Sequence, residues 1–476
     1  MKERINTFVI VFAVTFISVA VSYFMATSNI LVGPLVILGV FGFFIFMGII
    51  YDFSFGVYIL FLLGTFMFYV SRLIPAPIPF GIFYDALVVI TFAGIFLNVK
   101  QTKEWTNFNN VFTFFFVIIT AYQLLQLFNP NAVSISGWLV SMRNNTSLLL
   151  YITFFQLFIS LKNIRYFTIL WLGVAVIVAL YGIYQEVFGL TAFEWRWIFE
   201  APGRFELFYV WGSMRKFSFL SDPAAYGMFL SFSGLAFVAL AFGPYKGHWK
   251  FVFILTSLVV FVAMLYSGTR TATAMVAVGL LLLILMNINS TKVILFAMAI
   301  VFAGGIIFFG PFYSAEIIRL RSTFTPSEDA SMGVRDYKRL RFQNYIRTHP
   351  IGGGLMTTGT SGLQYSPGHP LAEGWDPDSG YLATALELGW IGLIIFIAFF
   401  AVVMIKGIIN HFSIADPFLK NMNLVYTMPF FALSVGHFTQ HAMFSRPANL
   451  IVIATYALLI RLPQFDRLNS DTIKKV

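Results

Sequence analysis

The chain has 476 residues, of which 59% are hydrophobic and only 11% are charged, and its mean hydropathy is +0.83. Soluble domains carry about 25% charged residues, so these values exclude a soluble globular protein and predict an integral membrane protein. The lack of cysteine excludes disulfides, thiolate metal sites and a cysteine nucleophile. The net charge of +10 reflects membrane topology rather than nucleic-acid binding, because the charges lie at the ends of apolar segments.

A helix needs about 20 mostly apolar residues to cross a bilayer. The basic residues at 1–4 lead into the first apolar segment, which we interpret as a retained helix rather than a cleaved signal peptide. The prediction is an all-α polytopic membrane protein with about 12–14 transmembrane helices, forming one membrane domain over residues 1–476. The candidate spans are 7–26, 30–50, 54–71, 80–98, 109–128, 144–161, 166–188, 223–242, 249–266, 271–287, 292–310, 381–405, 421–438 and 447–462.

Basic residues predict the orientation of these spans. With the N-terminus inside, nearly every internal connection carries a lysine or an arginine, as the positive-inside rule expects. Both termini are then cytoplasmic, and two polar segments, 189–222 and 311–380, are external loops. On this topology the inside holds 11 Lys and 4 Arg, whereas the outside holds 2 Lys and 13 Arg. Arginine is a planar bidentate donor suited to phosphate, so the external arginines suggest phosphate binding. The alternative is that they form ion pairs within folded loops.

The external segment 189–222 ends in the sequence Arg-Lys-Phe-Ser-Phe-Leu-Ser-Asp-Pro, residues 215–223. Arg215 precedes a predicted helix start, where a helix N-terminus and basic residues together attract an anion. Asp222 followed by Pro223 is typical of a helix N-cap and first turn. Capping is therefore the alternative to a functional role for Asp222.

A tight external turn, Ser267-Gly268-Thr269-Arg270, separates two spans. The small polar residues around Arg270 leave room for an oxyanion. The alternative is that Arg270 only extends its charge to the membrane surface, as arginines at helix ends do.

The loop 311–380 is basic in its first half and acidic in its second. Residues 333–348 are predicted to form a surface helix, with Arg335 and Arg339 on one face and Arg341 on another. Phosphate binding competes here with a solvated basic face near anionic headgroups. The glycines at 352–354 form a flexible turn that could approach a phosphate, but the Lys-Ser/Thr of a P-loop is absent.

The acidic half carries His369, Glu373 and Asp378. Asp378 is expected at or just before the N-terminus of the next membrane helix, where the helix dipole stabilises a carboxylate. Asp378 is then either a base or a plain N-cap. Glu387 lies two turns deeper, and an acid at that depth is usually functional or paired.

His437 and His441 are four residues apart near the external end of a span. This spacing suits a metal ion, but the sequence shows no third ligand nearby. We therefore predict no metal site.

These motifs combine with a pattern that runs from His349-Pro350-Ile351-Gly352 to Asp378-Ser379-Gly380-Tyr381-Leu382 and on to Leu386-Glu387-Leu388-Gly389. Together they resemble the O-antigen ligase and O-antigen/exopolysaccharide polymerase superfamily, over about residues 205–400. The ligase branch carries His followed by Asn at about the position of Asp378. The Asp-Ser pair of this chain departs from that pattern and favours the polymerase-like branch.

The resemblance implies a metal-independent glycosyltransferase of the bacterial inner membrane, without a cofactor, acting at the periplasmic face. Its partners would be a glycan donor on polyprenyl (undecaprenyl) diphosphate, a glycan or lipid acceptor, and membrane lipids, but not nucleic acid. On this hypothesis Asp378, or else His369, handles the acceptor proton, while Tyr381 and Glu373 contact sugar. The diphosphate is expected to bind to Arg215, Arg270, Arg335, Arg339 and Arg341.

Two alternatives remain open. A polymerase extends a second lipid-linked unit, whereas a ligase transfers the glycan to lipid A core or to protein. From another class, a lipid-linked glycan flippase or other transporter would also face this substrate. Transporters place ionisable groups near the membrane midplane, whereas the charges of this chain concentrate outside, which favours an enzyme.

Overall fold

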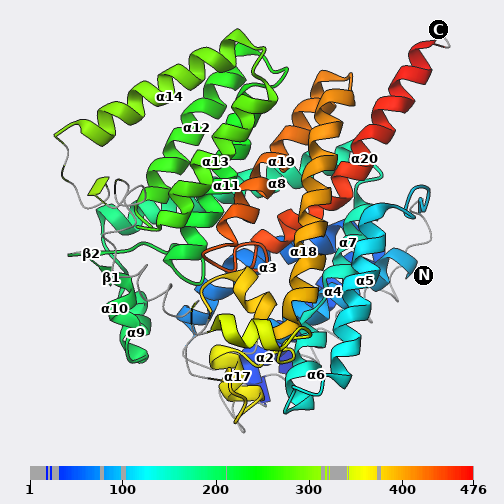
Figure 1. Ribbon diagram of the computed structural model, residues 1–476, viewed down its shortest axis with the longest axis vertical. Coiled ribbons are helices and arrows are strands. Elements are labelled where there is room, and N and C mark those ends of the chain that lie inside the picture. Colours follow the sequence, from blue (N-terminus) through cyan, green and yellow to red (C-terminus); the bar gives the residue numbers. More distant parts are fainter. Residues whose placement is uncertain are drawn as a thin grey trace.

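The computed structural model describes residues 18–19, 22–23, 32–74, 80–97, 103–210, 212–311, 313, 317–318, 321, 340, 342–372 and 377–474. Almost all of these residues are helical (Figure 1). The helices before the first long polar segment are α2 (Val32–Tyr51), α3 (Phe53–Leu73), α4 (Phe80–Leu97), α5 (Val111–Leu125), η1 (Gln126–Phe128), α6 (Ile135–Asn144), α7 (Ser147–Leu157) and α8 (Leu161–Val187). The remainder are α9 (Ala192–Glu200), α10 (Arg204–Phe208), α11 (Pro223–Ala241), α12 (Gly247–Leu265), α13 (Arg270–Met286), α14 (Thr291–Phe309), α17 (Gly359–Tyr365), α18 (Gly380–Ser413), α19 (Pro417–Gly436) and α20 (Ala448–Lys474).

The predicted fold class is confirmed. Within the described part of the chain, nine helices are long and apolar enough to cross a membrane, and two shorter apolar helices accompany them. The strands β1 (Tyr209–Val210) and β2 (Ser213–Met214) form one small antiparallel hairpin. The protein is therefore an all-α polytopic membrane protein.

Helix α11 forms the centre of the bundle. Nearly all of its residues are buried, and it packs against α8, α12, α13 and α19. Small residues allow this close approach: Gly227 lies against Ser267, and Gly234 lies against Phe261. The sequence of α11 is rich in alanine, glycine and serine for the same reason.

Helix α19 is largely enclosed by protein, and several of its buried side chains are polar. Asn421 Nδ2 donates to the carbonyl of Ala239 at 2.7 Å, and Asn423 Nδ2 donates to the carbonyl of Gly407 at 2.9 Å. Both asparagines are buried. The side-chain amides therefore take the place of water as hydrogen-bond partners for these two backbone carbonyls.

The predicted span 144–161 differs from the structure. Helix α7 has only 11 residues, which corresponds to about 16 Å at 1.5 Å per residue. Ser160 caps the next helix by accepting from the N–H of Lys162 at 3.2 Å, and this cap separates α7 from α8. Most of the predicted span 7–26 lies outside the described residues. Of the predicted surface helix 333–348, residues 340 and 342–348 are described and are helical, and the others lie outside the described residues.

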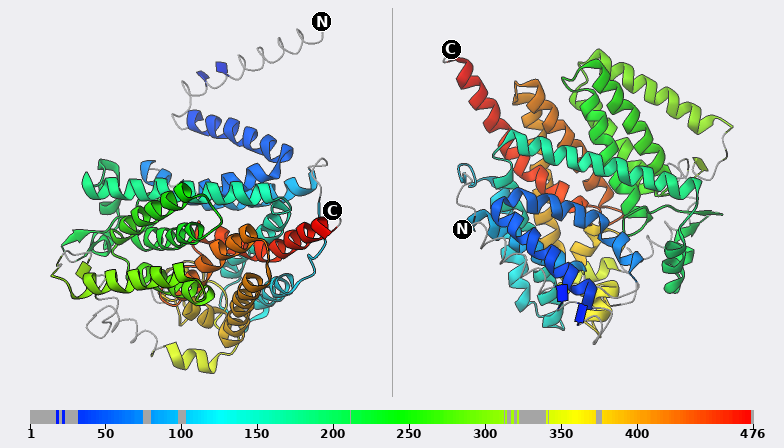
Figure 2. Two further views of the ribbon diagram at one scale, coloured as in Figure 1. Left: turned by 90° about the horizontal axis from the view of Figure 1, so that it is seen from above. Right: turned by 180° about the vertical axis from the view of Figure 1, so that it is seen from behind.

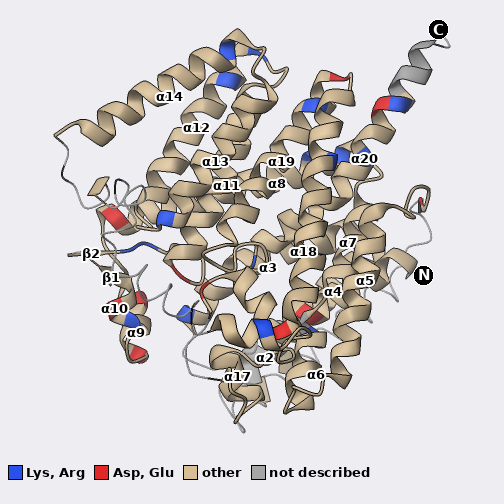
Figure 3. Cartoon of the chain, in the orientation of Figure 1, with Lys and Arg blue, Asp and Glu red and all other residues tan. Residues whose placement is uncertain are grey.

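Helices α6, α9, α10 and α17 gather at one end of the bundle, opposite the C-terminal end of α20 (Figures 1 and 2). We call this the site end. Charged residues lie mainly near the ends of the helices, and the middles of the helices are largely uncharged (Figure 3). This distribution is typical of helices that pass through lipid.

Helix α18 is broken at Gly389, whose φ of 70° and ψ of −179° are not helical. The break leaves carbonyl groups without helical partners, and residues 350–354 supply the donors. Gly353 N donates to the carbonyl of Leu386 at 2.8 Å, and Gly354 N donates to that of Glu387 at 3.0 Å. Tyr122 Oη donates to the carbonyl of Leu388 at 2.7 Å. The first part of α18, residues 380–388, is thus a short separate helix held by the glycine turn.

This arrangement predicts the effect of Gly389→Ala. A Cβ at this position would overlap the carbonyl of Pro350, and alanine disfavours positive φ by about 1–2 kcal/mol. We expect a lower midpoint of thermal unfolding in detergent. Gly173→Ala is the matched control, because Gly173 lies within α8 with open space around it and alanine favours a helix interior by about 0.5–1 kcal/mol. Equal midpoints for the two variants would contradict the proposed constraint at Gly389.

Candidate functional site

The structure brings together two of the motifs selected from the sequence. Arg215 follows β2, and its Nε donates to the carbonyl of Ser267 at 2.8 Å. Its Nη2 donates to Thr269 Oγ1 at 3.0 Å. Arg215 is only partly buried. The guanidinium is therefore fixed against the 267–270 turn while part of it remains accessible.

The backbone after Arg215 is held by helices that sequence analysis did not connect to it. Gln185 Oε1 accepts from the N–H of Ser218 at 2.9 Å, and Lys216 Nζ lies 3.2 Å from Glu186 Oε2. Arg72 Nη2 donates to the carbonyl of Ser218 at 2.8 Å. Helices α3 and α8 thus position the loop that carries Arg215.

Arg72 is a structural residue that the sequence analysis missed. It is 2% exposed, and its guanidinium carbon lies 4.7 Å from the ring centroid of Phe217 and 5.3 Å from that of Trp197. An arginine at the end of an apolar span usually reaches toward the membrane surface. Aromatic residues of the distant segment 189–222 cover this one instead.

Arg270 is the first residue of α13, as the turn motif suggested. The next residue, Thr271, has its Oγ1 2.6 Å from Oγ1 of Thr439. This hydrogen bond joins the start of α13 to the segment that follows α19. Arg270 is partly buried.

The segment 437–441 also contacts the start of α18. Gly380 N donates to the carbonyl of His437 at 3.0 Å, and His441 Nε2 lies 3.0 Å from the carbonyl oxygen of Pro377. A side chain at Gly380 would overlap the imidazole of His437. Residues 377–380 are therefore held close to the 267–271 turn through segment 437–441.

Asp378 is not the N-cap of α18. That role belongs to Ser379, whose hydroxyl accepts from the N–H of Leu382 at 3.3 Å. Asp378 is the preceding residue and is partly exposed. The capping alternative for Asp378 is therefore wrong, because the helix begins one residue later than that alternative requires.

Tyr381 packs into the first turn of α18. Its hydroxyl donates to the carbonyl of Ser434 at 2.9 Å, and its ring meets that of His437 edge to face at 4.8 Å. The side chain is partly buried.

His369 is buried, with 4% of its surface exposed. Its Nδ1 accepts from the N–H of Leu371 at 3.1 Å, and its Nε2 lies 3.5 Å from Tyr345 Oη. Burial, with a smaller effect from the neighbouring His349, lowers the pKa of His369 below its ordinary value. The imidazole is therefore neutral near pH 7.

Glu387 is paired, as the sequence suggested for an acid at this depth. Its Oε1 accepts from Thr358 Oγ1 at 2.7 Å. The N–H groups of Gly352, Gly353 and Gly354 also bond within the protein, the first to the carbonyl of His349 at 2.9 Å. Gly353 and Gly354 bond to α18, so the glycine turn completes the broken helix and does not offer its N–H groups to a phosphate.

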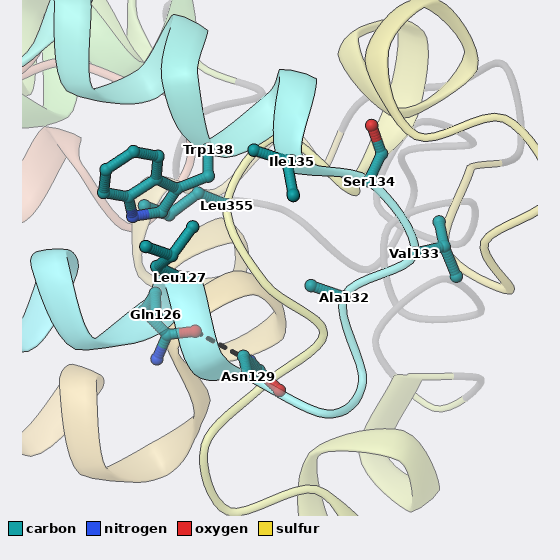
Figure 4. A pocket seen from close by; sticks show the side chains of 9 residues that line it. All are labelled: Gln126, Leu127, Asn129, Ala132, Val133, Ser134, Ile135, Trp138 and Leu355. Atoms are coloured by element: carbon teal, nitrogen blue, oxygen red, sulfur yellow. Dashed lines mark hydrogen bonds between the residues drawn. The ribbon is translucent and has the colours of Figure 1, made fainter.

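A small cavity of about 110 Å³ lies behind this turn, between η1, α6 and Leu355 (Figure 4). Gln126 and Asn129 line it, and their side chains are bonded to each other at 2.7 Å. Gln126 Nε2 also donates to the carbonyl of Ile351 at 3.1 Å, and Asn129 Nδ2 donates to that of Gly352 at 3.2 Å. These amides support the turn from the side opposite α18.

The remaining predicted site residues, Arg335, Arg339, Arg341 and Glu373, lie outside the described residues. The His437–His441 pair has ring centroids 6.4 Å apart, and burial and the neighbouring His441 lower the pKa of His437 to about 3. No group of three or more metal-ligating side chains is found in the described part of the chain.

The capping role of Asp222 is confirmed and can be measured. Its Oδ1 accepts from the N–H groups of Ala224 at 2.8 Å and Ala225 at 2.9 Å. Asp416 forms the same two bonds at the start of α19 and is also followed by proline. We expect Asp222→Ala and Asp416→Ala each to lower the free energy of unfolding by about 0.5–2 kcal/mol. The measurement is the equilibrium unfolding of the detergent-solubilised protein.

Comparing the activities of Asp222→Ala and Asp416→Ala also tests whether Asp222 has a catalytic role besides capping. If capping is its main role, both variants should lose activity only in proportion to their loss of folded protein. A much larger loss of activity in Asp222→Ala at equal folded amounts would show that capping is not its main role.

Comparison with known families gives one match. Residues 254–397 match a family model described as O-antigen ligase. No curated protein matches the chain. The matched segment begins within α12 and ends within α18, so it includes Arg270, His369, Asp378 and the break at Gly389. The resemblance predicted from the sequence is confirmed over this segment.

Proposed function

We propose that this chain, whose residues 254–397 belong to the O-antigen ligase family, is a glycosyltransferase that takes glycan from a polyprenyl-diphosphate-linked donor. The observation that carries the proposal is a series of hydrogen bonds that connects its basic and acidic motifs. Arg215 is bonded to the 267–269 turn, and Thr271 is bonded to Thr439. Segment 437–441 in turn contacts both sides of Asp378.

The basic side of this site suits the leaving group. Breaking the bond between a sugar and a diphosphate places negative charge on the diphosphate, and positioned arginines stabilise such charge. We assign this role to Arg215 and Arg270, with Arg335, Arg339 and Arg341 contributing. Arg215 is already held in one orientation by its hydrogen bonds to the turn, so little ordering is needed when the donor binds.

The acidic side suits the acceptor. Asp378 is partly exposed and directly precedes the N-cap of α18, and a carboxylate at this position suits orienting or deprotonating a sugar hydroxyl. His369, the other candidate, is buried, and its Nδ1 already accepts a backbone hydrogen bond. We therefore favour Asp378. Tyr381 and Glu373 are proposed to contact the sugar.

The reaction is proposed to take place at the periplasmic face of the bacterial inner membrane, with both termini in the cytoplasm. The Asp378-Ser379 pair favours glycan polymerisation. Ligation of the glycan to lipid A core or protein is the second possibility, since the two reactions differ only in the acceptor.

The arginine assignment predicts the outcome of Arg215→Ala and Arg270→Ala. Each should reduce glycan transfer by at least about 100-fold, the usual effect of removing one group that stabilises developing charge. Arg196→Ala is the matched control from the same polar segment. Arg196 is exposed and makes a surface pair with Glu200 at 3.5 Å and one hydrogen bond to the carbonyl of Arg72 at 3.2 Å, and exposed pairs contribute about 0–1 kcal/mol. Substantial transfer by both site variants would disprove the assignment.

The protein is reconstituted into proteoliposomes with purified lipid-linked repeat units, and glycan transfer is measured. Size-exclusion chromatography gives the amount of folded protein, so that variants are compared at equal amounts. A ladder of longer lipid-linked glycan indicates a polymerase, and transfer to added lipid A core or protein indicates a ligase. Movement of unchanged glycan across the bilayer would instead identify a transporter and overturn the proposal.

A further inference from the structure

His441 lies beside Asp378 and has no role in the function proposed above. Its Nε2 is 3.0 Å from the carbonyl oxygen of Pro377, which belongs to the peptide unit immediately before Asp378. The imidazole is exposed. An exposed imidazole thus adjoins the peptide unit that precedes Asp378.

The bond to Pro377 determines which nitrogen of His441 carries the proton. A carbonyl oxygen only accepts hydrogen bonds, so Nε2 must be the donor. In the neutral ring Nδ1 is then the unprotonated nitrogen. Within the described residues no group donates a hydrogen bond to Nδ1. His441 therefore combines a fixed ring with an accessible basic nitrogen.

The surroundings of His441 connect it to both halves of the proposed site. Thr439, two residues earlier, is bonded to Thr271 at the start of α13. His441 thus lies between the proposed diphosphate-binding arginines and the acidic residues.

The other histidines of the site end lack this combination of features. His369 is buried and its Nδ1 accepts from Leu371. His437 is buried against Gly380. His349 stacks on Tyr345 at 3.9 Å, and its Nδ1 lies 3.0 Å from the carbonyl of that residue.

We propose that His441 accepts the proton of the attacking acceptor hydroxyl, with Asp378 orienting that hydroxyl. The inference rests on the glycosyltransferase function proposed above. The hydroxyl oxygen forms a bond to the anomeric carbon while the bond between that carbon and the diphosphate oxygen breaks. The electron pair of the broken bond leaves with the polyprenyl diphosphate, the proton moves to Nδ1 of His441, and water removes it before the next turnover.

The decisive variant is His441→Gln. Glutamine retains an N–H donor for the carbonyl of Pro377 but has no basic nitrogen. In proteoliposomes with lipid-linked repeat units, kcat should fall by about 100- to 10,000-fold, the usual contribution of general acid–base catalysis, while KM changes little. His248→Gln is the control, because His248 is an exposed histidine in the first turn of α12, at the end opposite the site, and should leave kcat unchanged.

Chemical rescue distinguishes proton transfer from simple support of residues 377–380. In His441→Ala, added imidazole should restore part of kcat, because it supplies the missing base. A His441→Gln enzyme with more than about one third of the wild-type kcat would overturn the proposal, since a general base contributes far more. So would an inactive His441→Ala enzyme that imidazole does not rescue. Lack of transfer by the wild-type protein would instead count against the proposed function itself.

Discussion

The hydrogen bonds between the glycine turn and the broken helix α18 determine the arrangement of the site end. A backbone carbonyl without a partner in a membrane-embedded bundle costs several kcal/mol, so a helix cannot simply stop there. The N–H groups of Gly353 and Gly354 pair with the carbonyls of Leu386 and Glu387. The break thereby allows residues 380–388 to form a separate short helix, with Asp378 just before its N-terminus.

The site is assembled from segments that are far apart in the chain. Segment 437–441 is central, because it bonds to Pro377 and Gly380 on one side and to Thr271 on the other. Arg215 joins the same region through Ser267 and Thr269. In the proposed reaction, binding of the leaving group and handling of the acceptor proton therefore depend on contacts among α11, α13, α18 and α19.

Several parts of this arrangement were predictable from local sequence. Asp222 followed by Pro223 predicts a helix N-cap because the pattern depends on neighbouring residues alone, and the structure confirms it. The N-cap of α18 could not be predicted in the same way, because Asp378 and Ser379 both suit an N-cap. Ser379 is the cap because the helix begins at Gly380. The extent of α7 was not predictable, because its apolar residues suit a buried helix and a membrane span equally well.

Apolar composition and the periodic recurrence of long hydrophobic segments by themselves determined that this protein is an all-α bundle in a membrane, because lipid leaves few other ways to satisfy the backbone. The motifs around Arg270 and Asp378 also predicted the resemblance to O-antigen ligases, which the family match over residues 254–397 supports. Only the tertiary structure decided that Arg72 and Gln185 hold the loop of Arg215 and that His441 lies beside Asp378. These contacts join residues separated by tens to hundreds of positions, and no local pattern encodes such distances.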